Sequence, residues 1–268
     1  MNREERIMKR VQEHYDYLQQ KGYEIVFLAL QGSQNYELDV YDEEYMSDVD
    51  TKAVILPSFE DFVYNRQPVS ETIVLENNEH IDVKDVRVMF ETYKKQNVNF
   101  IETLFSKFRI INEKYKDLVQ PLFDNAEEIA HININQSLRC MAGMSKEKLK
   151  ALKHPYPTIA DKIEKYGYDP KQLHHICRMN DFIKKYARGL PYKDCLVPDC
   201  KDDLINIKKG VLQLDIAEQL AVLLDNDTYN AKEENVTETD VINQKGIDIL
   251  NKVKFDLLER KFKEDLLK

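Results

Sequence analysis

The 268-residue chain predicts an α+β fold, in which a β-sheet with flanking helices is followed by a C-terminal helical domain. Strand-like segments, short and apolar or alternating with a period of two, are confined to the first 105 or so residues. From Asn125 onward, apolar side chains recur at helical spacing. We place the boundary near Pro121, which gives domains over residues 1–120 and 121–268.

The N-terminal region begins with an amphipathic helix and a buried strand. Apolar side chains recur at helical spacing over residues 5–21, which predicts a helix with one buried face. Residues 24–30 are a short apolar run between Gly22 and Gly32, which is typical of a buried strand. Gly32 allows the backbone to approach a ligand closely, and the Ser33 hydroxyl can donate a hydrogen bond.

A second strand, predicted over residues 47–56, begins with two carboxylates. The period of two along a strand points Asp48 and Asp50 to the same face. Two carboxylates on one face can share a divalent cation such as Mg²⁺.

A third acid is expected from the segment 79–85. Ile81 and Val83 alternate with Asp82, so the apolar pair would pack into the core while Asp82 faces the other way. We favour Asp82 as the third metal ligand. Asp85 is the alternative, although it precedes a helical pattern that begins near Val86 and could instead be the N-cap.

The acidic segment has a simpler interpretation as a polar turn that enters an edge strand, because Asp-x-Asp pairs are common in loops. The combination of features favours a catalytic site. A buried strand ending in Gly-Ser, a strand with paired acids and a strand with a third acid follow one another in that order.

In these residues the chain resembles the DNA polymerase β-like nucleotidyltransferase superfamily, and within it the stand-alone bacterial and phage predicted nucleotidyltransferases. The segment Asn97–Phe105 is similar to the Asn-Pro-x-x-x-Glu element of that family, with Val98 in place of proline. The resemblance implies a mixed β-sheet and a metal-dependent transferase. It makes Asp48, Asp50 and Asp82 the catalytic carboxylates that bind Mg²⁺ or Mn²⁺.

The resemblance continues at Tyr166–Lys171, which is similar to a Gly-Tyr-Asp-x-Lys helix start. Asp169 is suited to cap the helix, and proline at position 170 suits its first turn. Lys171, His175 and Arg178 then share one helix face, where they could bind the phosphates of a nucleotide. The alternative is an ordinary solvated basic face.

The second half is predicted to contain helices over residues 129–144, 169–186, 211–224 and 241–267. The polar, acidic stretch 225–240 shows no apolar period and predicts a long exposed loop. Charge is uneven, because residues 139–193 contain 13 Lys and Arg against 5 Asp and Glu in a chain of net charge −9. The overall acidity argues against tight non-specific binding to duplex DNA.

Composition is that of a soluble globular protein, with 43% hydrophobic and 32% charged residues. No apolar stretch reaches membrane-spanning length and the N-terminus lacks the apolar core of a signal peptide, so we expect a cytoplasmic protein without a membrane partner. The four cysteines lack the spacing of a zinc site or a disulfide framework. We interpret His80 as structural.

The predicted function is metal-dependent transfer of a nucleoside monophosphate from a nucleoside triphosphate to a hydroxyl acceptor, with release of pyrophosphate. Gly32 and Ser33 would bind the β- and γ-phosphates. Lys171, His175 and Arg178 would neutralise the departing pyrophosphate. Three alternatives stay open: a toxin- or defence-type enzyme that modifies RNA or protein, a catalytically degenerate nucleotide-binding protein, and an assembly protein.

Overall fold

A computed structural model describes residues 1–41 and 46–267. The chain forms two compact units, each of which is assembled from segments far apart in the sequence. The sheet unit comprises Met1–Asn35, Glu43–Asn133 and Ile242–Lys268, and the helical unit comprises Tyr36–Asp42 and Ile134–Val241. This division differs from a single cut at residue 120, because the C-terminal helix returns to the sheet unit.

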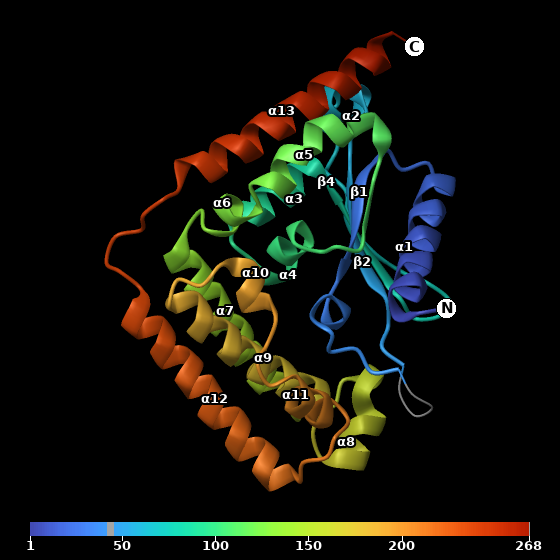
Figure 1. The fold of residues 1–268 in the computed structure, drawn as a ribbon. Helices are drawn as coiled ribbons and strands as arrows, with labels where there is room; N and C mark the ends of the chain where they lie inside the picture. The colour runs from blue at the N-terminus through green and yellow to red at the C-terminus, as the bar shows by residue number, and fades with distance from the viewer. Residues whose placement is uncertain (42–45, 268) are drawn as a thin grey trace. The chain divides into compact units, whose positions relative to one another are not determined.

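The sheet unit contains a five-stranded mixed sheet with the order β3-β4-β2-β1-β5 (Figure 1). β2 and β4 are parallel, and the other neighbouring pairs are antiparallel. The strands are β1 (Ile25–Gln31), β2 (Asp50–Ile55), β3 (Ser70–Val74), β4 (His80–Asp85) and β5 (Arg109–Ile111). The predicted strands at 24–30, 47–56 and 79–85 correspond to β1, β2 and β4, which confirms the α+β fold class.

One face of the sheet is covered by α1 (Arg3–Gln20), as Figure 1 shows. The helix begins with a capping box between Asn2 and Glu5. Its apolar side chains, among them Ile7 and Leu18, pack in one core cluster with residues of β1, β2 and β4. Ile81 and Val83 belong to this cluster, so the predicted alternation along β4 is confirmed.

Helices also cover the opposite face of the sheet. Phe27 of β1 meets Phe123 of α5 edge to face, with the ring centroids 5.3 Å apart. The C-terminal helix α13 packs against α2, α3, α5 and α6 and buries Leu250 and Leu257. The helices of this unit besides α1 are α2 (Phe59–Val63), α3 (Val86–Lys94), α4 (Val98–Ile101), α5 (Lys116–Asp124), α6 (Ala126–Ala130) and α13 (Gln244–Leu266).

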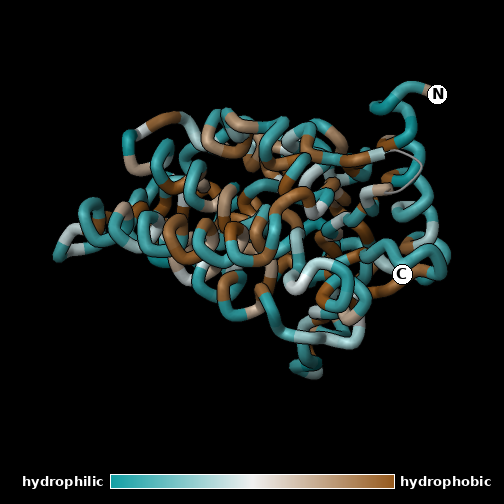
Figure 2. Tube along the Cα trace, turned by 90° about the horizontal axis from the view of Figure 1, so that it is seen from below, coloured by the Kyte–Doolittle hydropathy of each residue, from teal (hydrophilic) through white to brown (hydrophobic). Residues whose placement is uncertain are grey.

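The helical unit is built around α9, which contacts α7, α10, α11 and α12. Its helices are α7 (Ile134–Ala151), α8 (Ala160–Tyr166), α9 (Pro170–Ala187), α10 (Tyr192–Leu196), α11 (Lys201–Lys208) and α12 (Leu214–Asn235). Along these helices hydrophobic and hydrophilic stretches alternate, as expected for amphipathic helices (Figure 2). Asp169 caps α9 through the Lys171 N–H and proline occupies the first turn, which confirms the predicted helix start.

The predicted loop over residues 225–240 is wrong, because α12 continues to Asn235. Buried Thr228 and the Asn180 side chain hold this part of the helix to α9: the Asn180 amide donates to Asp227 Oδ2 and lies 3.2 Å from Thr228 Oγ1. After Thr228, residues 229–235 of the helix are exposed or only half-buried. A helical segment with few buried side chains has little apolar periodicity in its sequence.

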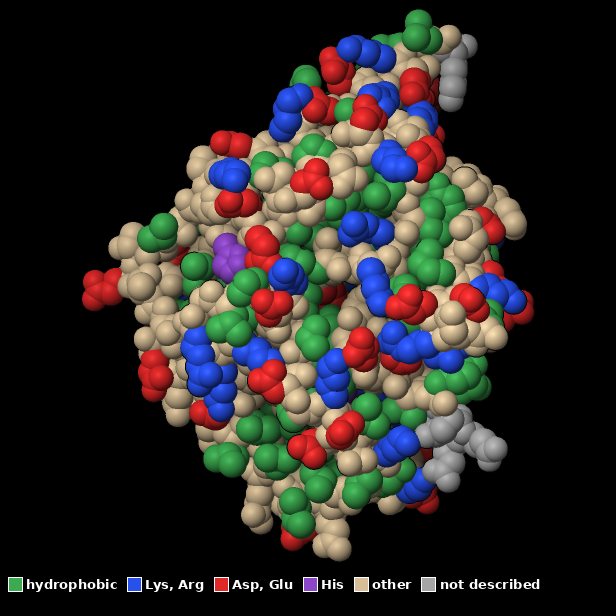
Figure 3. All heavy atoms as spheres, viewed as in Figure 1, with side chains coloured by type: hydrophobic (Ala, Val, Ile, Leu, Met, Phe, Trp, Pro, Cys, Tyr) green, Lys and Arg blue, Asp and Glu red, His purple; other side chains and the backbone are tan. Residues whose placement is uncertain are grey.

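Among the described residues, no helix is long and apolar enough to cross a membrane. Cys140, Cys177, Cys195 and Cys200 form no disulfide bonds in the structure. On the face shown in Figure 3, Lys and Arg side chains are interspersed with Asp and Glu.

Candidate functional site

The Gly-Ser turn lies directly after β1, at one end of the sheet. Gly32 adopts φ +85°, a conformation that glycine takes without steric cost, and a 3₁₀ turn follows from Ser33 to Tyr36. The Asn35 side chain donates to the Leu30 carbonyl, and the Asn35 N–H donates to the Gly32 carbonyl. These bonds fix a tight backbone turn. Among the described residues, no atom outside Gly32 and its two chain neighbours lies within 4 Å of the position that a Cβ at Gly32 would occupy, so the space beside it is open.

The acidic strand is brought next to this turn by the pairing of β1 with β2. Gln31 and Asp50 are partners in the antiparallel register, so the turn and the first residue of β2 lie at the same end of two adjacent strands. Gln34 adds a second link, because its amide donates to the carbonyl of Asp48 at 2.7 Å and to that of Ser47 at 3.3 Å. The backbone that carries the two predicted acids is thereby held against the Gly-Ser turn.

Glu102 connects a third segment to the turn. This glutamate follows α4, is buried, and accepts a hydrogen bond from the Gly32 N–H at 2.9 Å. The Gly32 N–H therefore binds a carboxylate of the chain itself. From the sequence, Glu102 is recognised only as part of the Asn97–Phe105 element. A signal for its role was present, since a single glutamate among buried Ile101, Thr103 and Leu104 needs a hydrogen-bond donor.

Asp82 faces away from the α1 core, as predicted, but its carboxylate is already paired. Asp82 is the register partner of Lys52, whose Nζ lies 2.8 Å from Oδ2, and the Lys84 Nζ lies 2.9 Å from Oδ1. The Lys52 ammonium also lies 4.1 Å from the centre of the Phe100 ring. Burial tends to raise the pKa of Asp82, but the two ammonium groups outweigh burial and lower it. Burial lowers the pKa of Lys52 despite its carboxylate partner.

The residue that lies opposite Asp50 on β4 is His80. The His80 N–H donates to Asp50 Oδ1 at 2.8 Å, and the Nδ1 atom of the ring lies 3.2 Å from the same oxygen. The register that pairs Lys52 with Asp82 places Asp50 beside His80, two residues earlier on both strands. From the sequence we interpreted His80 as structural. Its position beside Asp50 depends on the register between two strands, which cannot be deduced from either strand alone.

Asp85, the other candidate for the third acid, is the N-cap of α3. Its position before the helical pattern had suggested this role. Its carboxylate accepts from the Arg87 N–H at 2.8 Å and forms a two-point ion pair with the Arg87 guanidinium at 2.7 and 3.0 Å. The side chain is almost completely buried. Asp85 lies at the opposite end of β4 from His80.

Within residues 1–41 and 46–267 no group of three or more His, Cys, Asp or Glu side chains could hold a metal ion. Magnesium in nucleotide sites often takes only one or two carboxylates and completes its shell with phosphate oxygens and water. Exposed Asp48 and half-buried Asp50 fit that smaller donor set. Asp82 would first have to leave two ammonium groups, and its assignment as a ligand stays a prediction.

In the helical unit, Lys171, His175 and Arg178 all lie on α9, but their environments differ. Lys171 is exposed, whereas Arg178 is buried with its guanidinium 4.4 Å from the centre of the Tyr36 ring. Burial, with the neighbouring His174 and Arg178, lowers the pKa of His175 well below its usual value, so the ring is neutral at pH 7. Burial likewise lowers the pKa of His174, to about 3.

Much of the basic stretch 139–193 is neutralised within the helical unit. Among the described residues, Arg139 pairs with Asp240, Lys153 with Glu218, Lys184 with Asp227, and Lys185 with both Asp181 and Asp199. For exposed Arg139 and Lys153 and half-buried Lys184 the interpretation as an ordinary solvated surface is the better one, whereas Lys185 is buried. Binding of phosphate by Lys171, His175 and Arg178 stays a prediction.

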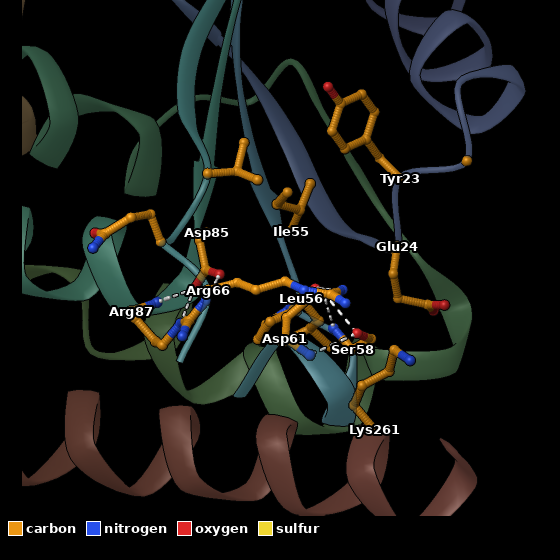
Figure 4. Close-up of a pocket in the computed structure, with 14 residues that line it drawn as sticks. Tyr23, Glu24, Ile55, Leu56, Ser58, Asp61, Arg66, Asp85, Arg87 and Lys261 are labelled. Atoms are coloured by element: carbon orange, nitrogen blue, oxygen red, sulfur yellow. Dashed lines mark hydrogen bonds and ion pairs between the residues drawn. The ribbon is translucent and has the colours of Figure 1, made fainter. Parts of the chain in front are cut away.

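A second feature of the sheet unit is a pocket of about 380 Å³ beyond the opposite ends of β2 and β4 (Figure 4). Arg66 donates to Asp61 Oδ1, and Arg87 points to Asp85. Hydrogen bonds from Ser58 and Arg66 lower the pKa of Asp61 to about 2. The described residues that line the pocket include three cations and three carboxylates, so the lining has no excess charge that would select an ionic ligand: Arg66, Arg87 and Lys261, and Glu24, Asp61 and Asp85.

Comparison with known proteins gives little additional information. No protein-family model matches the chain, and no curated protein matches it. The crystal structure of a nucleotidyltransferase-like protein from Exiguobacterium sibiricum 255-15 is similar to 95% of this chain and 75% of that chain, with 11% sequence identity and a TM-score of 0.28. At this TM-score the similarity carries no argument, so function is inferred from the residues of this chain.

Proposed function

We propose that the protein is a metal-dependent nucleotidyltransferase, which transfers a nucleoside monophosphate from a nucleoside triphosphate to a hydroxyl acceptor and releases pyrophosphate. One observation carries the proposal: the Gly-Ser turn and the first acid of β2 are register neighbours at one end of the sheet. Gln34 holds the two segments together, and Glu102 fixes the turn itself. A turn open to close approach beside paired carboxylates suits a triphosphate with its metal ion.

The roles of the residues follow from their chemistry. Asp48 and Asp50 would hold Mg²⁺ or Mn²⁺, which would neutralise charge on the phosphates and polarise the reacting phosphoryl group. Ser33 would donate to a β- or γ-phosphate oxygen, and the absent side chain of Gly32 would leave room for the phosphate. Because Glu102 occupies the Gly32 N–H, we assign Gly32 a steric role rather than that of a hydrogen-bond donor.

The other predicted residues would complete the acid set and bind the pyrophosphate. Asp82 would complete the acid set only if Lys52 and Lys84 moved to the phosphates that they would then help to neutralise. Lys171 and Arg178 carry the positive charges suited to pyrophosphate, whereas neutral His175 would contribute a hydrogen bond. The acceptor could be a nucleic acid end, a small molecule or a protein.

A second candidate is a nucleotide-binding protein without catalysis. The position of His80 favours it, because a ring nitrogen and not a third carboxylate lies opposite Asp50. Such a protein would bind a triphosphate with its metal ion but would release no pyrophosphate.

Thermal stabilisation by each of ATP, GTP, CTP and UTP, with and without Mg²⁺, tests the proposal. We expect a Mg²⁺-dependent shift for at least one nucleotide, lost in Asp48→Asn/Asp50→Asn. The matched control is Asp16→Asn on α1, which should keep the shift because Asp16 is exposed and accepts a hydrogen bond from Gln12 of the same helix.

Pyrophosphate release with the stabilising nucleotide then separates the two candidates. Release that depends on Asp48 and Asp50 supports the transferase. Thermal stabilisation without pyrophosphate release, across nucleic acid, small-molecule and protein acceptors, supports the binding protein. If no nucleotide stabilises the protein, both candidate functions are contradicted.

A further inference from the structure

A buried polar network lies beneath the acidic strand, on the face of the sheet that α1 covers. His14, Thr51 and Glu79 are all buried, within a core that is otherwise built from apolar side chains. A polar group in such a place costs free energy unless its hydrogen bonds are satisfied. The hydrogen bonds within the network therefore offset the cost of burying its polar groups. Its contacts show which part of the chain it holds.

Glu79 is the centre of this network. Its Oε2 atom accepts from Arg10 at 2.6 Å and lies 3.0 Å from His14 Nε2. Its Oε1 atom accepts from the Val49 N–H at 3.2 Å. The other ring nitrogen of His14, Nδ1, lies 2.9 Å from the Thr51 hydroxyl.

The carboxylate is held in its charged form. Burial tends to raise the pKa of Glu79, but hydrogen bonds with His14, Arg10 and Asn77 outweigh burial and lower the pKa to about 2. The hydrogen bond with Glu79 correspondingly raises the pKa of Arg10. Hydrogen bonds to an ionised carboxylate are stronger than neutral ones. The charged Glu79 carboxylate therefore stabilises the position of the Val49 N–H that it binds.

The two residues bound by the network alternate with the predicted metal ligands. Val49 lies between Asp48 and Asp50, and Thr51 follows Asp50. Since side chains alternate along a strand, fixing residues 49 and 51 on the α1 face fixes the backbone from which the acids project on the other side. Metal sites are sensitive to such support, because loss of a partner that orients a ligand typically lowers metal affinity 10–100-fold.

We propose that Glu79, held by Arg10 and His14 of α1, is a positioning residue for the metal-binding acids Asp48 and Asp50. This inference rests on the proposed nucleotidyltransferase function. As a positioning residue, Glu79 does not contact the substrate. It acts through the Val49 amide, by setting the backbone geometry between the two carboxylates.

The test compares Glu79→Gln with the matched control Glu13→Gln. Both glutamates pair with Arg10, but the Glu13 side chain is 41% exposed on the surface of α1 and contacts Arg10 and Lys9 of the same helix. Arg10→Gln is a milder third variant, since it weakens the charge support of Glu79 while leaving the His14 contact in place.

Two readouts are needed. The first is hydrogen exchange of the Val49 amide, which reports the support of the strand directly. The second is the affinity for Mn²⁺ with the stabilising triphosphate, measured from the electron paramagnetic resonance signal of free Mn²⁺, together with kcat and KM. In Glu79→Gln we expect exchange at Val49 to rise at least about tenfold and Mn²⁺ affinity to fall by about tenfold or more. Arg10→Gln should change both less, and Glu13→Gln should change neither.

The inference is overturned if folded Glu79→Gln keeps the wild-type Val49 exchange and Mn²⁺ affinity, or if it loses thermal stability alone. If Glu79→Gln does not fold, Arg10→Gln decides by the same two readouts. If wild-type protein binds no Mn²⁺ with any triphosphate, the proposed function fails, and the exchange at Val49 still decides whether Glu79 supports this strand.

Discussion

Replacing Asp82 with Asn separates two roles that this carboxylate could have. In the structure it neutralises Lys52, which is only 5% exposed, and Lys84. Removing one partner of a buried ion pair costs about 3–5 kcal/mol, because the other charge stays buried without compensation. The Asn amide oxygen can still accept one hydrogen bond, so we expect Asp82→Asn to lower the free energy of unfolding by about 3 kcal/mol, the lower end of that range.

Urea unfolding followed by circular dichroism measures this cost, and hydrogen exchange in β2 and β4 reports the sheet unit separately. The control Asp50→Asn should cost about 1 kcal/mol or less, because half-buried Asp50 accepts from an N–H that Asn can also satisfy. In a double-mutant cycle with Lys52→Met we expect a coupling of at least about 2 kcal/mol.

The ion-pair account is refuted if Asp82→Asn stays within about 0.5 kcal/mol of wild type, or if its effect simply adds to that of Lys52→Met. Loss of Mn²⁺ and nucleotide binding in a variant of unchanged stability would instead establish Asp82 as the third metal ligand.

Three further predictions concern stability. Gly143→Ala should stabilise the protein by about 0.5–1 kcal/mol in urea unfolding, because Gly143 is an exposed residue inside α7 with open space among the described residues around its Cβ position; destabilisation would contradict this. Gly210→Ala should cost more than Gly189→Ala in the same assay, since both have positive φ but only the first Cβ would lie 2.5 Å from the Tyr166 ring, and equal costs would argue against that clash. Glu79, with its pKa lowered from 4.5 to about 2, should contribute about 3 kcal/mol above pH 4.5, lost as the pH falls toward 2; acid titrations of unfolding free energy should show this loss in wild type and not in Glu79→Gln.

Local patterns were enough to predict much of the fold. The helix at residues 5–21, the three strands and the start of α9 were confirmed because each depends on neighbouring residues: apolar period, proline at the first helical position and an Asp cap. The edge strands β3 and β5 were missed. β3 is largely exposed and so has no alternation of burial, and β5 is only three residues long.

The candidate site was predictable only in part. Apolar runs ending in Gly-Ser and beginning with Asp-Val-Asp indicated the two strands that are in fact neighbours, with Gln31 beside Asp50. The link from Glu102 to Gly32 joins residues 70 positions apart, and nothing local indicates which amide a buried glutamate will bind. The network around Glu79 likewise joins α1 to strands far along the chain.

The amino-acid sequence by itself determined which face of each strand a side chain occupies, because alternation along a strand is a local property with a period of two. Asp82 therefore lies opposite Ile81 and Val83, as predicted. Only the tertiary structure decided that Lys52 is the partner of Asp82 and that His80 lies opposite Asp50. The physical reason is that register between β2 and β4 depends on packing across segments 30 residues apart, and a shift of two residues keeps every side chain on its face while exchanging all of its partners.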